Sequence, residues 1–422
     1  MTAAGNLESH QELYNTSNKP LCLDQSKLNI DARSRTSRLP WRGQFSPEFV
    51  EYIIKNVCRN SRSFLDPFCG SGTVLFEAVR NEHSAIGLEV NPAAWHLACL
   101  SSFAAIKSSE KENIVTQLRG ILAVYSSKGL ALFPKNVSPC DLIEEINRES
   151  SHPFLPQALA AAILLGMGND RDFTPECITR GLFTVLSILN ELESLTAPAN
   201  CFISDARTPP LAPESIDAVI TSPPYINVFN YHQNYRPAVE ILGWKALLAA
   251  RSEVGSNRKN RQNRFLTVIQ YCLDMAECIK ATANVMKIGA PLVMVVGRTS
   301  NVLGASFRNG DIIRRIIDAS GAFAPLQLAE RVFTSRFGER IYEDILITHR
   351  NSYSSINPTD AREIGKNALL FALNDVPEKN RSTLEEAIAT TPKVEASPYL
   401  NITTPIAFSS SIASNKILNG YY

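Results

Sequence analysis

A glycine-rich turn between a strand and a helix is the feature that most constrains how this chain folds. Residues 63–66 (SFLD) predict a short strand, residues 67–73 (PFCGSGT) a turn, and residues 74–80 a helix. Residues 83–90 (HSAIGLEV) predict a second strand that ends in an acid, and another helix begins at Pro92. This alternation predicts βαβ units and therefore a parallel sheet.

The same sheet is expected to resume after a long interruption. Residues 101–198 carry helical patterns without strands, and we interpret them as a helical insertion. Strand patterns return at 201–204, 216–221 and 291–297, and residues 326–333 and 340–349 predict a hairpin that closes the sheet. We therefore predict a doubly wound, Rossmann-like α/β fold with a mostly parallel, seven-stranded sheet.

The rest of the chain divides around this sheet. Residues 1–40 predict a polar N-terminal arm, and residues 41–100 and 199–350 together predict one discontinuous catalytic domain. Residues 351–422 predict a partly disordered C-terminal extension with helices at 360–373 and 382–390. Its last part, 397–422, is rich in Ser, Thr and Asn, so we expect it to fray.

Composition limits the partners and the compartment. A net charge of +1 means that any surface for nucleic acid must be local. The nine cysteines form no C-x-x-C pair and match no histidine cluster, which predicts no metal site and a reduced, cytoplasmic setting. Residues 1–20 are polar, and the most apolar run, 155–167, is shorter than the roughly 20 residues that a bilayer needs, so neither secretion nor membrane insertion is expected.

The glycine turn and two acids predict a nucleoside site. Glycines let the backbone approach a ligand, and the following helix N-terminus is electropositive. Glu89 ends the second strand, where doubly wound folds place the acid that pairs with ribose hydroxyls, and Asp205 follows the third strand, where it could accept a hydrogen bond from adenine. The turn is not G-x-G-x-x-G and lacks the lysine of a phosphate-binding loop, so a nucleoside triphosphate is disfavoured.

The tetrapeptide SPPY at residues 222–225 follows a predicted strand and suits the chemistry of an exocyclic amine. Two prolines remove two amide donors and leave their carbonyls as acceptors. The Ser222 hydroxyl and the Pro223 carbonyl can accept both N–H groups of an amine, and Tyr225 offers a flat face on which a ring can stack. A ring-attacking cysteine is not expected, because Cys140 of the only Ser-Pro-Cys run lies in the helical insertion.

DPFCGSGT (66–73) resembles the cofactor motif of amino-group DNA methyltransferases, and TSPPY (221–225) resembles their catalytic motif. The resemblance implies a class I methyltransferase fold, bound S-adenosyl-L-methionine and methyl transfer to N4 of cytosine, for which a serine at position 222 is the usual mark. Residues 41–47 resemble the family's N-terminal cofactor motif. Catalysis is assigned to Ser222, Pro223, Pro224 and Tyr225, and cofactor binding to Phe45, Ser46, Asp66, Pro67, Phe68, Cys69, Gly70, Ser71, Gly72, Thr73, Glu89, Val90, Asp205 and Ala206.

Double-stranded DNA is the partner that the family implies, with a site-specific role in restriction-modification or phage defence and a cognate endonuclease encoded nearby. Three alternatives remain open: an adenine-N6 enzyme, a guanine-N2 RNA methyltransferase, and a catalytically silent binding subunit. The cofactor motif precedes SPPY here, unlike in many N4-cytosine enzymes. Candidate phosphate contacts are Arg251, Arg258, Lys259, Arg261 and Arg264, with Arg331, Arg336 and Arg340 beside the hairpin.

Overall fold

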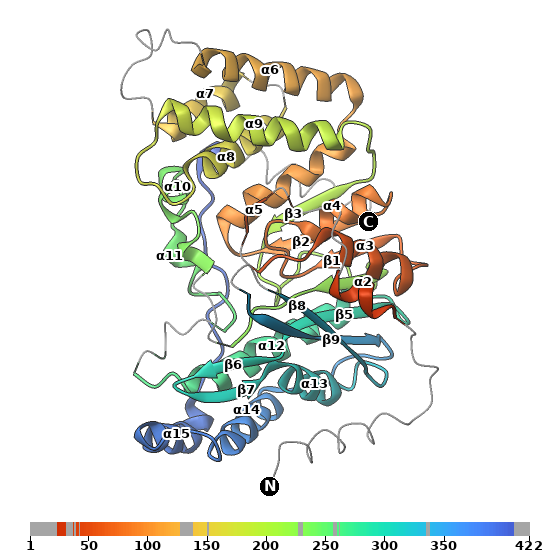
Figure 1. Cartoon of the computed structure of the whole chain (residues 1–422), viewed down its shortest axis with the longest axis vertical. Helices are drawn as coiled ribbons and strands as arrows, with labels where there is room; N and C mark the ends of the chain where they lie inside the picture. The colour runs from red at the N-terminus through yellow and green to blue at the C-terminus, as the bar shows by residue number, and fades with distance from the viewer. Residues whose placement is uncertain are drawn as a thin grey trace.

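A central seven-stranded sheet organises the computed structural model of this chain (Figure 1). Its strand order is β3-β2-β1-β4-β5-β9-β8, in which β9 runs antiparallel to both of its neighbours and the first five strands are parallel. The bounds are β1 (Ser63–Asp66), β2 (Ser84–Glu89), β3 (Ala199–Ile203), β4 (Ala218–Thr221), β5 (Pro291–Gly297), β8 (Gln327–Thr334) and β9 (Arg340–His349). The structure describes residues 23–30, 37, 39–41, 43–126, 138–149, 152–226, 231–255, 260, 262–334 and 338–408.

Helices cover both faces of the sheet because successive strand residues point to opposite sides. Phe64 belongs to one hydrophobic cluster and Leu65 to the other, and Val293 and Met294 divide in the same way. One face packs against α3 (Pro47–Asn56), α4 (Thr73–Arg80) and α5 (Pro92–Ala98), and the other against α12 (Leu266–Val285), α13 (Asn309–Ser320) and α14 (Pro358–Ala372). The prediction of a doubly wound, mostly parallel α/β fold is confirmed.

The segment between β2 and β3 is helical and shares the core of one sheet face. It lies at the top of Figure 1, where α8 is apolar and buried along its length. Gly181 lets α9 approach α8 closely, because a Cβ there would meet the Ala162 carbonyl oxygen at 1.7 Å. The elements are η2 (Cys99–Ala105), α6 (Ser108–Ser126), α7 (Pro139–Glu149), α8 (Phe154–Met167) and α9 (Pro175–Leu192). None of the helices that the structure describes could cross a membrane.

Several elements outside the sheet had no counterpart in the sequence predictions. A two-stranded hairpin, β6 (Thr299–Val302) with β7 (Ala305–Arg308), follows β5 directly. The remaining helices mostly flank the sheet or follow it along the chain. They are α2 (Gln25–Asn29), η4 (Tyr231–Gln233), α10 (Arg236–Ile241), α11 (Ala246–Ala249), α15 (Glu378–Thr390), η5 (Thr391–Lys393) and η6 (Ile406–Phe408). Among them, α15 overlaps the helix predicted at 382–390.

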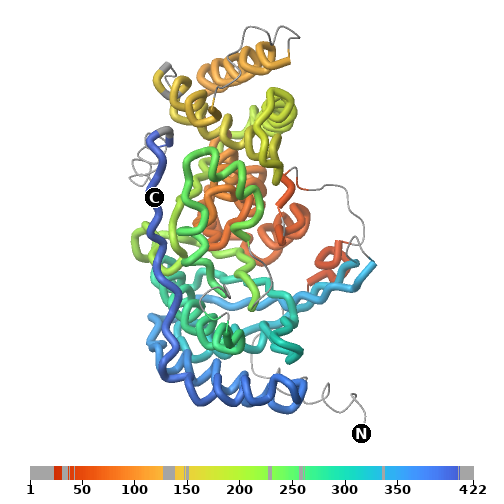
Figure 2. The backbone as a smooth tube through the Cα atoms, turned by 90° about the vertical axis from the view of Figure 1, so that its left-hand side faces the viewer, coloured from red at the N-terminus to blue at the C-terminus, as the bar shows by residue number. Residues whose placement is uncertain are grey.

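The C-terminal segment 397–408 is docked along the molecule, so the prediction that residues 397–422 fray is wrong for this part of the segment. Figure 2 shows this blue segment running from α15 along the length of the chain. At its start, the Ser397 N–H donates to Asp274 Oδ1 over 2.7 Å. At its end, the Phe408 ring stacks on Trp244 with centroids 5.9 Å apart. Residues 409–422 lie outside the described part of the chain.

Candidate active site

A cavity opens at the carboxyl ends of the parallel strands, where open α/β sheets bind ligands. It gathers residues that are far apart in the sequence: the segment before α3, the turn after β1, the end of β2, the residues after β3 and the loop after β4. The predicted site residues that line it are Phe45, Asp66, Pro67, Phe68, Cys69, Gly70, Ser71, Thr73, Glu89, Val90, Asp205, Ala206, Ser222 and Pro224.

The turn after β1 is shaped by two buried carboxylates. Asp66 Oδ1 accepts hydrogen bonds from the Phe68 N–H over 3.1 Å and from the Thr221 hydroxyl over 2.6 Å. Glu89 Oε2 accepts from the Gly70 N–H over 2.9 Å, and its Oε1 accepts from the N–H of Asn91 over 2.8 Å. A carboxylate oxygen can accept two hydrogen bonds, so both Glu89 oxygens retain capacity for a ligand's hydroxyls.

Burial raises the pKa of both carboxyls to about 7, against the hydrogen bonds that they accept. The pKa of Asp66 is higher in the folded protein than its unfolded value of 3.8, so the stabilisation from protonated Asp66 is fully present below pH 3.8. This stabilisation is lost as the pH rises toward 7. Asp66 therefore destabilises the cofactor-free protein at neutral pH. A positively charged or hydrogen-bonding ligand in the cavity would relieve this destabilisation.

Asp66→Asn is expected to gain stability relative to the wild type as the pH rises. The asparagine keeps the acceptor for Phe68 and Thr221 but does not ionise, so the difference should grow by up to about 1.4 kcal/mol per pH unit between pH 5 and 7. Urea unfolding of both cofactor-free proteins across this range measures it. Asp217→Asn is the control: despite partial burial, the hydrogen bond from Lys287 lowers the pKa of Asp217, so its contribution is constant above pH 5. A pH-independent difference for Asp66→Asn would contradict the burial account.

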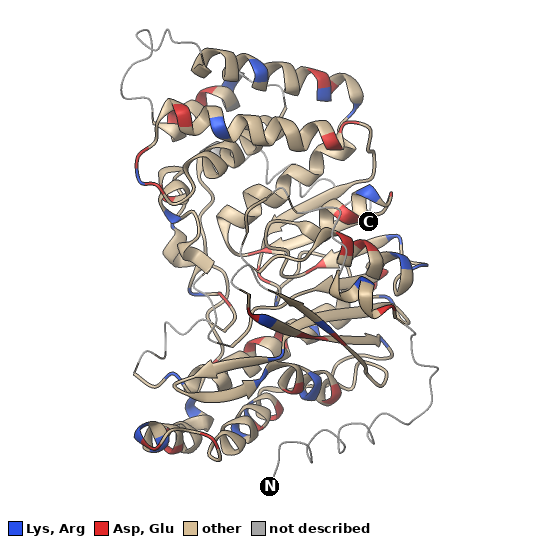
Figure 3. Ribbon diagram, in the orientation of Figure 1, with Lys and Arg blue, Asp and Glu red and all other residues tan. Residues whose placement is uncertain are grey.

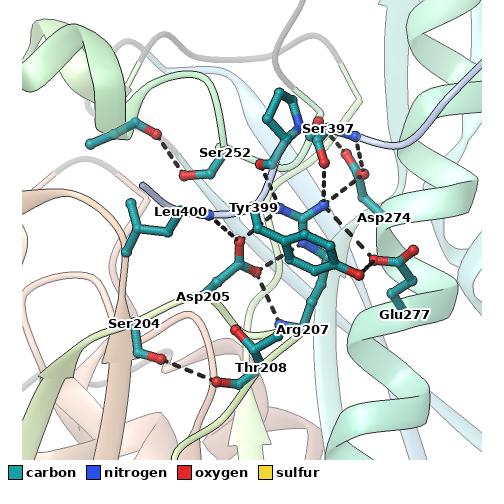
Figure 4. A network of polar contacts seen from close by, with 12 residues as sticks. Ser204, Asp205, Arg207, Thr208, Ser252, Asp274, Glu277, Ser397, Tyr399 and Leu400 are labelled. Carbon is teal, nitrogen blue, oxygen red and sulfur yellow. Dashed lines mark hydrogen bonds and ion pairs between the residues drawn. The ribbon is translucent and has the colours of Figure 1, made fainter. Parts of the chain in front are cut away.

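Asp205 is held in a buried network that uses its acceptor positions (Figure 4). Its Oδ1 accepts from the Arg207 N–H over 3.0 Å and from Arg207 Nε over 2.9 Å. Its Oδ2 accepts from Arg207 Nη2 over 2.7 Å and from the Leu400 N–H over 3.1 Å. These four bonds fill the roughly four acceptor sites of a carboxylate. Asp205 was predicted to accept a hydrogen bond from the adenine amino group, but these contacts leave it no free acceptor position, and its carboxylate shapes the cavity wall instead.

The same network ties the C-terminal segment to this wall. Arg207 Nη1 donates to the Ser397 carbonyl over 2.6 Å, and Nη2 donates to the Pro398 carbonyl over 2.8 Å. Asp274 Oδ2 accepts from the Ser397 hydroxyl over 2.6 Å and Asp274 Oδ1 lies 3.4 Å from Arg207. Figure 4 shows these groups converging on one guanidinium, which balances two buried carboxylates.

Two predicted cofactor residues do other work. Gly72 is the N-cap of α4 with a φ of 89°, and a Cβ on it would lie 3.0 Å from Ala98, so the packing of the helix requires a glycine there. It does not line the cavity. Ser46 occupies the predicted cap position of α3 but makes no side-chain cap bond; its hydroxyl bonds to Arg331 instead, over 2.9 Å. It lines a neighbouring cavity.

The loop after β4, predicted to be catalytic, divides between cavity and core. Ser222 and Pro224 face the cavity, whereas Pro223 and Tyr225 are not among its lining residues. The Tyr225 ring packs on Gly297 at the end of β5, where a Cβ would come within 2.6 Å of it, and burial raises its pKa. Its hydroxyl interacts with Ser222 and donates to Glu343 Oε1 over 3.5 Å. In this arrangement Tyr225 supports Ser222 rather than presenting its face to the cavity.

Sequence reasoning missed the part of the wall that follows the catalytic loop. Tyr231, Ser252, Glu253 and Val254 all line the cavity, although the region around them was interpreted as facing DNA. Glu253 is buried; its Oε2 pairs with His232 Nδ1 over 3.1 Å, and its Oε1 has no partner within the described residues. The signal in the sequence was the acid Glu253 beside the apolar Val254. The interpretation of this region as a basic surface for DNA overlooked it. Trp41, Gly43, Gln44, Leu88 and Asn91 complete the lining.

The candidate phosphate contacts are only partly visible. Arg251 is exposed and Arg264 is half-buried, whereas Arg258, Lys259, Arg261 and Arg336 lie outside the described residues. Arg331 was expected on the surface but is buried, with 4% of its area exposed, because it pairs with Glu343. Figure 3 shows acidic and basic residues on the paired strands β8 and β9.

The DNA methylase family N6_N4_Mtase matches residues 8–99, which include the turn after β1 but not residues 222–225. A type II methyltransferase of Methanocaldococcus jannaschii, M.MjaII, is 28% identical over 109 residues, which are 26% of this chain and 19% of that relative. The chain thus matches about a fifth of that relative's length.

Solved structures give weaker likenesses. A SAM-dependent methyltransferase of Methanosarcina mazei aligns with 71% of this chain and 97% of its own, at 13% identity and a TM-score of 0.34. The rRNA methyltransferase AviRa of Streptomyces viridochromogenes aligns with 82% and 96%, at 13% identity and a TM-score of 0.31.

The sheet order, with one antiparallel strand inserted beside β5, is that of class I methyltransferases, whose cofactor is S-adenosyl-L-methionine. The cavity fits this cofactor. Glu89 keeps acceptor capacity for ribose hydroxyls, Asp66 and the unpartnered Glu253 Oε1 can receive donors, and Val90 and Val254 offer apolar surface for an adenine ring.

Proposed function

We propose that this chain is an S-adenosyl-L-methionine-dependent DNA methyltransferase that modifies an exocyclic amine, N4 of cytosine in preference to N6 of adenine. One observation carries the proposal: Ser222 lines both the cofactor cavity and a second cavity beside it. Gly43, Gln44 and Phe45 also border both. A side chain at such a junction can contact molecules bound in both spaces.

The chain's part in the reaction is to position an amine. The Ser222 hydroxyl and the Pro223 carbonyl accept the two N–H groups, which directs the nitrogen lone pair toward the cofactor cavity. When bound, S-adenosyl-L-methionine supplies an electrophilic methyl group on a sulfonium centre. That methyl group would pass directly to the nitrogen as its bond to sulfur breaks, leaving S-adenosylhomocysteine, and the methylated amine would release one proton to solvent. A base in duplex DNA must be flipped out to reach Ser222.

The DNA methylase family match and the type II methyltransferase relative support DNA as the substrate. We propose double-stranded DNA, with Arg251 and the basic residues after it as phosphate contacts. A restriction-modification role, with a cognate endonuclease, follows from the same likeness. The fold alone would equally suit an RNA amine, so the experiments below compare both nucleic acids.

Ser222→Ala is expected to lower the turnover number about tenfold, because it removes one hydrogen bond that orients the amine. Tyr225→Phe should act in the same direction by releasing the serine. Calorimetry should show affinities for S-adenosylhomocysteine within about twofold of wild type for both variants. Initial rates of tritiated methyl transfer to DNA and to RNA measure turnover.

Ser306→Ala, on an exposed position of β7, is the matched control and should keep the wild-type rate. Equal losses of cofactor affinity and turnover in Ser222→Ala would contradict the proposed division of roles. If the tritium label is incorporated into RNA alone, the substrate is RNA and the proposal of a DNA substrate is wrong.

A further inference from the structure

The second cavity has two charged lining residues, Arg331 and Glu343, that cofactor binding does not explain. It is bordered by the residues before α3, by Ser222 and by Arg331, Phe333 and Glu343 of the closing hairpin. Arg331 on β8 is the register partner of Glu343 on β9, so the antiparallel pairing itself sets the two side chains opposite each other. Both are largely buried: 5% and 14% of their side-chain areas are exposed.

Arg331 is fixed on several sides. Its Nη1 lies 3.1 Å from Glu343 Oε2, and its Nη2 donates to Ser46 Oγ over 2.9 Å. The guanidinium also lies over the rings of Phe49 and Phe333, at 4.9 and 4.7 Å from their centroids. Stacking and ion pairing together hold the planar group in a fixed position in a largely buried site.

Glu343 connects this guanidinium to the catalytic loop. Its Oε1 accepts from the Tyr225 hydroxyl, which in turn interacts with Ser222. Burying a charged pair costs desolvation that the pairing alone often fails to recover, so a buried pair is weak support for stability. A pair that lines a cavity next to the reacting serine has a second use, which is to present a cationic donor to whatever enters.

The edges of the two candidate bases differ at the end far from the amine. Cytosine presents the N4 amine, the N3 acceptor and then the O2 carbonyl acceptor. Adenine presents the N6 amine, the N1 acceptor and then a C–H group. A rigid cationic donor beyond the ring nitrogen satisfies O2 of cytosine, whereas adenine would leave the donor facing carbon, which costs the unmade bond.

We propose that Arg331 selects cytosine in this cavity by donating to O2, and that Glu343 is the positioning residue that holds Arg331 and Tyr225 in register with Ser222. The proposal rests on the amino-methyltransferase function above and assigns its base specificity to a residue pair outside the catalytic motif. Phe333 supplies the apolar wall beside the base.

The test is nucleoside mass spectrometry of genomic DNA from a methylation-free bacterial host that expresses each full-length variant. The wild type should produce N4-methylcytosine. Arg331→Met should reduce it at least tenfold and raise the ratio of N6-methyladenine to N4-methylcytosine, because a hydrogen bond to a charged group is lost. Glu343→Gln should give a smaller reduction, since glutamine keeps an acceptor for Tyr225. Arg314→Met, on the partly exposed face of α13, should match the wild type.

The affinity of each purified variant for S-adenosylhomocysteine shows whether its fold is intact, and it should stay within about twofold of wild type. If Arg331→Met loses that binding, Arg331→Lys takes its place, and it should also reduce N4-methylcytosine because a lysine cannot make the same fixed contacts. Wild-type levels of N4-methylcytosine in a folded Arg331 variant would overturn the inference. If the wild type makes only N6-methyladenine, the inference is overturned but amine methylation still stands. If the wild type binds the cofactor and methylates neither base, the proposed function itself is overturned.

Discussion

Replacing Glu89 by glutamine is expected to weaken the binding of S-adenosylhomocysteine about a hundredfold. Each Glu89 oxygen already accepts one backbone N–H, from Gly70 and Asn91, and each can accept one hydroxyl of a ribose. A glutamine must turn its NH₂ group toward one of those backbone donors, so both the turn and the ligand contact suffer. Two hydrogen bonds to a charged group contribute about 3 kcal/mol at the low end of their range, which corresponds to roughly two orders of magnitude in affinity.

Isothermal titration calorimetry measures this loss directly. Glu82→Gln is the matched control, because Glu82 is exposed beyond the opposite end of β2 and should leave the affinity unchanged. An unchanged affinity for Glu89→Gln in a folded protein would remove Glu89 from the cofactor site and, with it, the orientation of the cofactor in the cavity.

The second large effect is expected from Arg207→Met, which should lower the free energy of unfolding by about 3–5 kcal/mol. The guanidinium is fully buried between Asp205 and Asp274, and its removal leaves both carboxylates without their counter-charge. It also frees the carbonyls of Ser397 and Pro398, so the C-terminal segment should detach near this point. Urea unfolding measures the stability, and limited proteolysis reports on the segment.

Arg298→Met provides the comparison. Arg298 likewise meets two carboxylates, those of Glu330 and Asp344, but with 30% of its side chain exposed, so its loss should cost no more than about 1 kcal/mol. Adding Asp274→Asn to Arg207→Met should recover part of the stability by removing one stranded charge. Equal effects of the two arginine substitutions would contradict the buried-network account.

Local sequence patterns predicted the parts of the fold that depend on local patterns. β5 and β9 begin and end at the predicted residues. β5 is a continuous apolar run and β9 follows a clear turn, and both patterns can be recognised in the sequence without knowing which elements pack against them. The turn after β1 and the loop after β4 were also placed correctly at the carboxyl edge of the sheet, since the fold class dictates that edge. The hairpin of β6 and β7 was missed because its short, polar strands resemble a loop.

Side-chain roles that depend on distant partners could not be read in the same way. Asp205 was expected to face a ligand, but Arg207 and Leu400 occupy its oxygens, and Leu400 lies in a segment whose composition predicted fraying. Arg331 was expected on the surface, and only its pairing with Glu343 across two strands explains its burial. Composition describes how polar a segment is. Whether a charged side chain is buried also depends on whether the fold places an opposite charge next to it.

The central claim, that Ser222 presents an exocyclic amine of a DNA base to the cofactor, is tested most directly by one measurement. The purified chain is incubated with plasmid DNA from a methylation-free host and with S-adenosyl-L-methionine carrying a trideuterated methyl group, and the digested nucleosides are analysed by mass spectrometry. We predict trideuterated N4-methylcytosine in the DNA, reduced about tenfold by Ser222→Ala. If calorimetry shows that the protein binds the cofactor but the DNA carries no trideuterated methyl group, the account is contradicted.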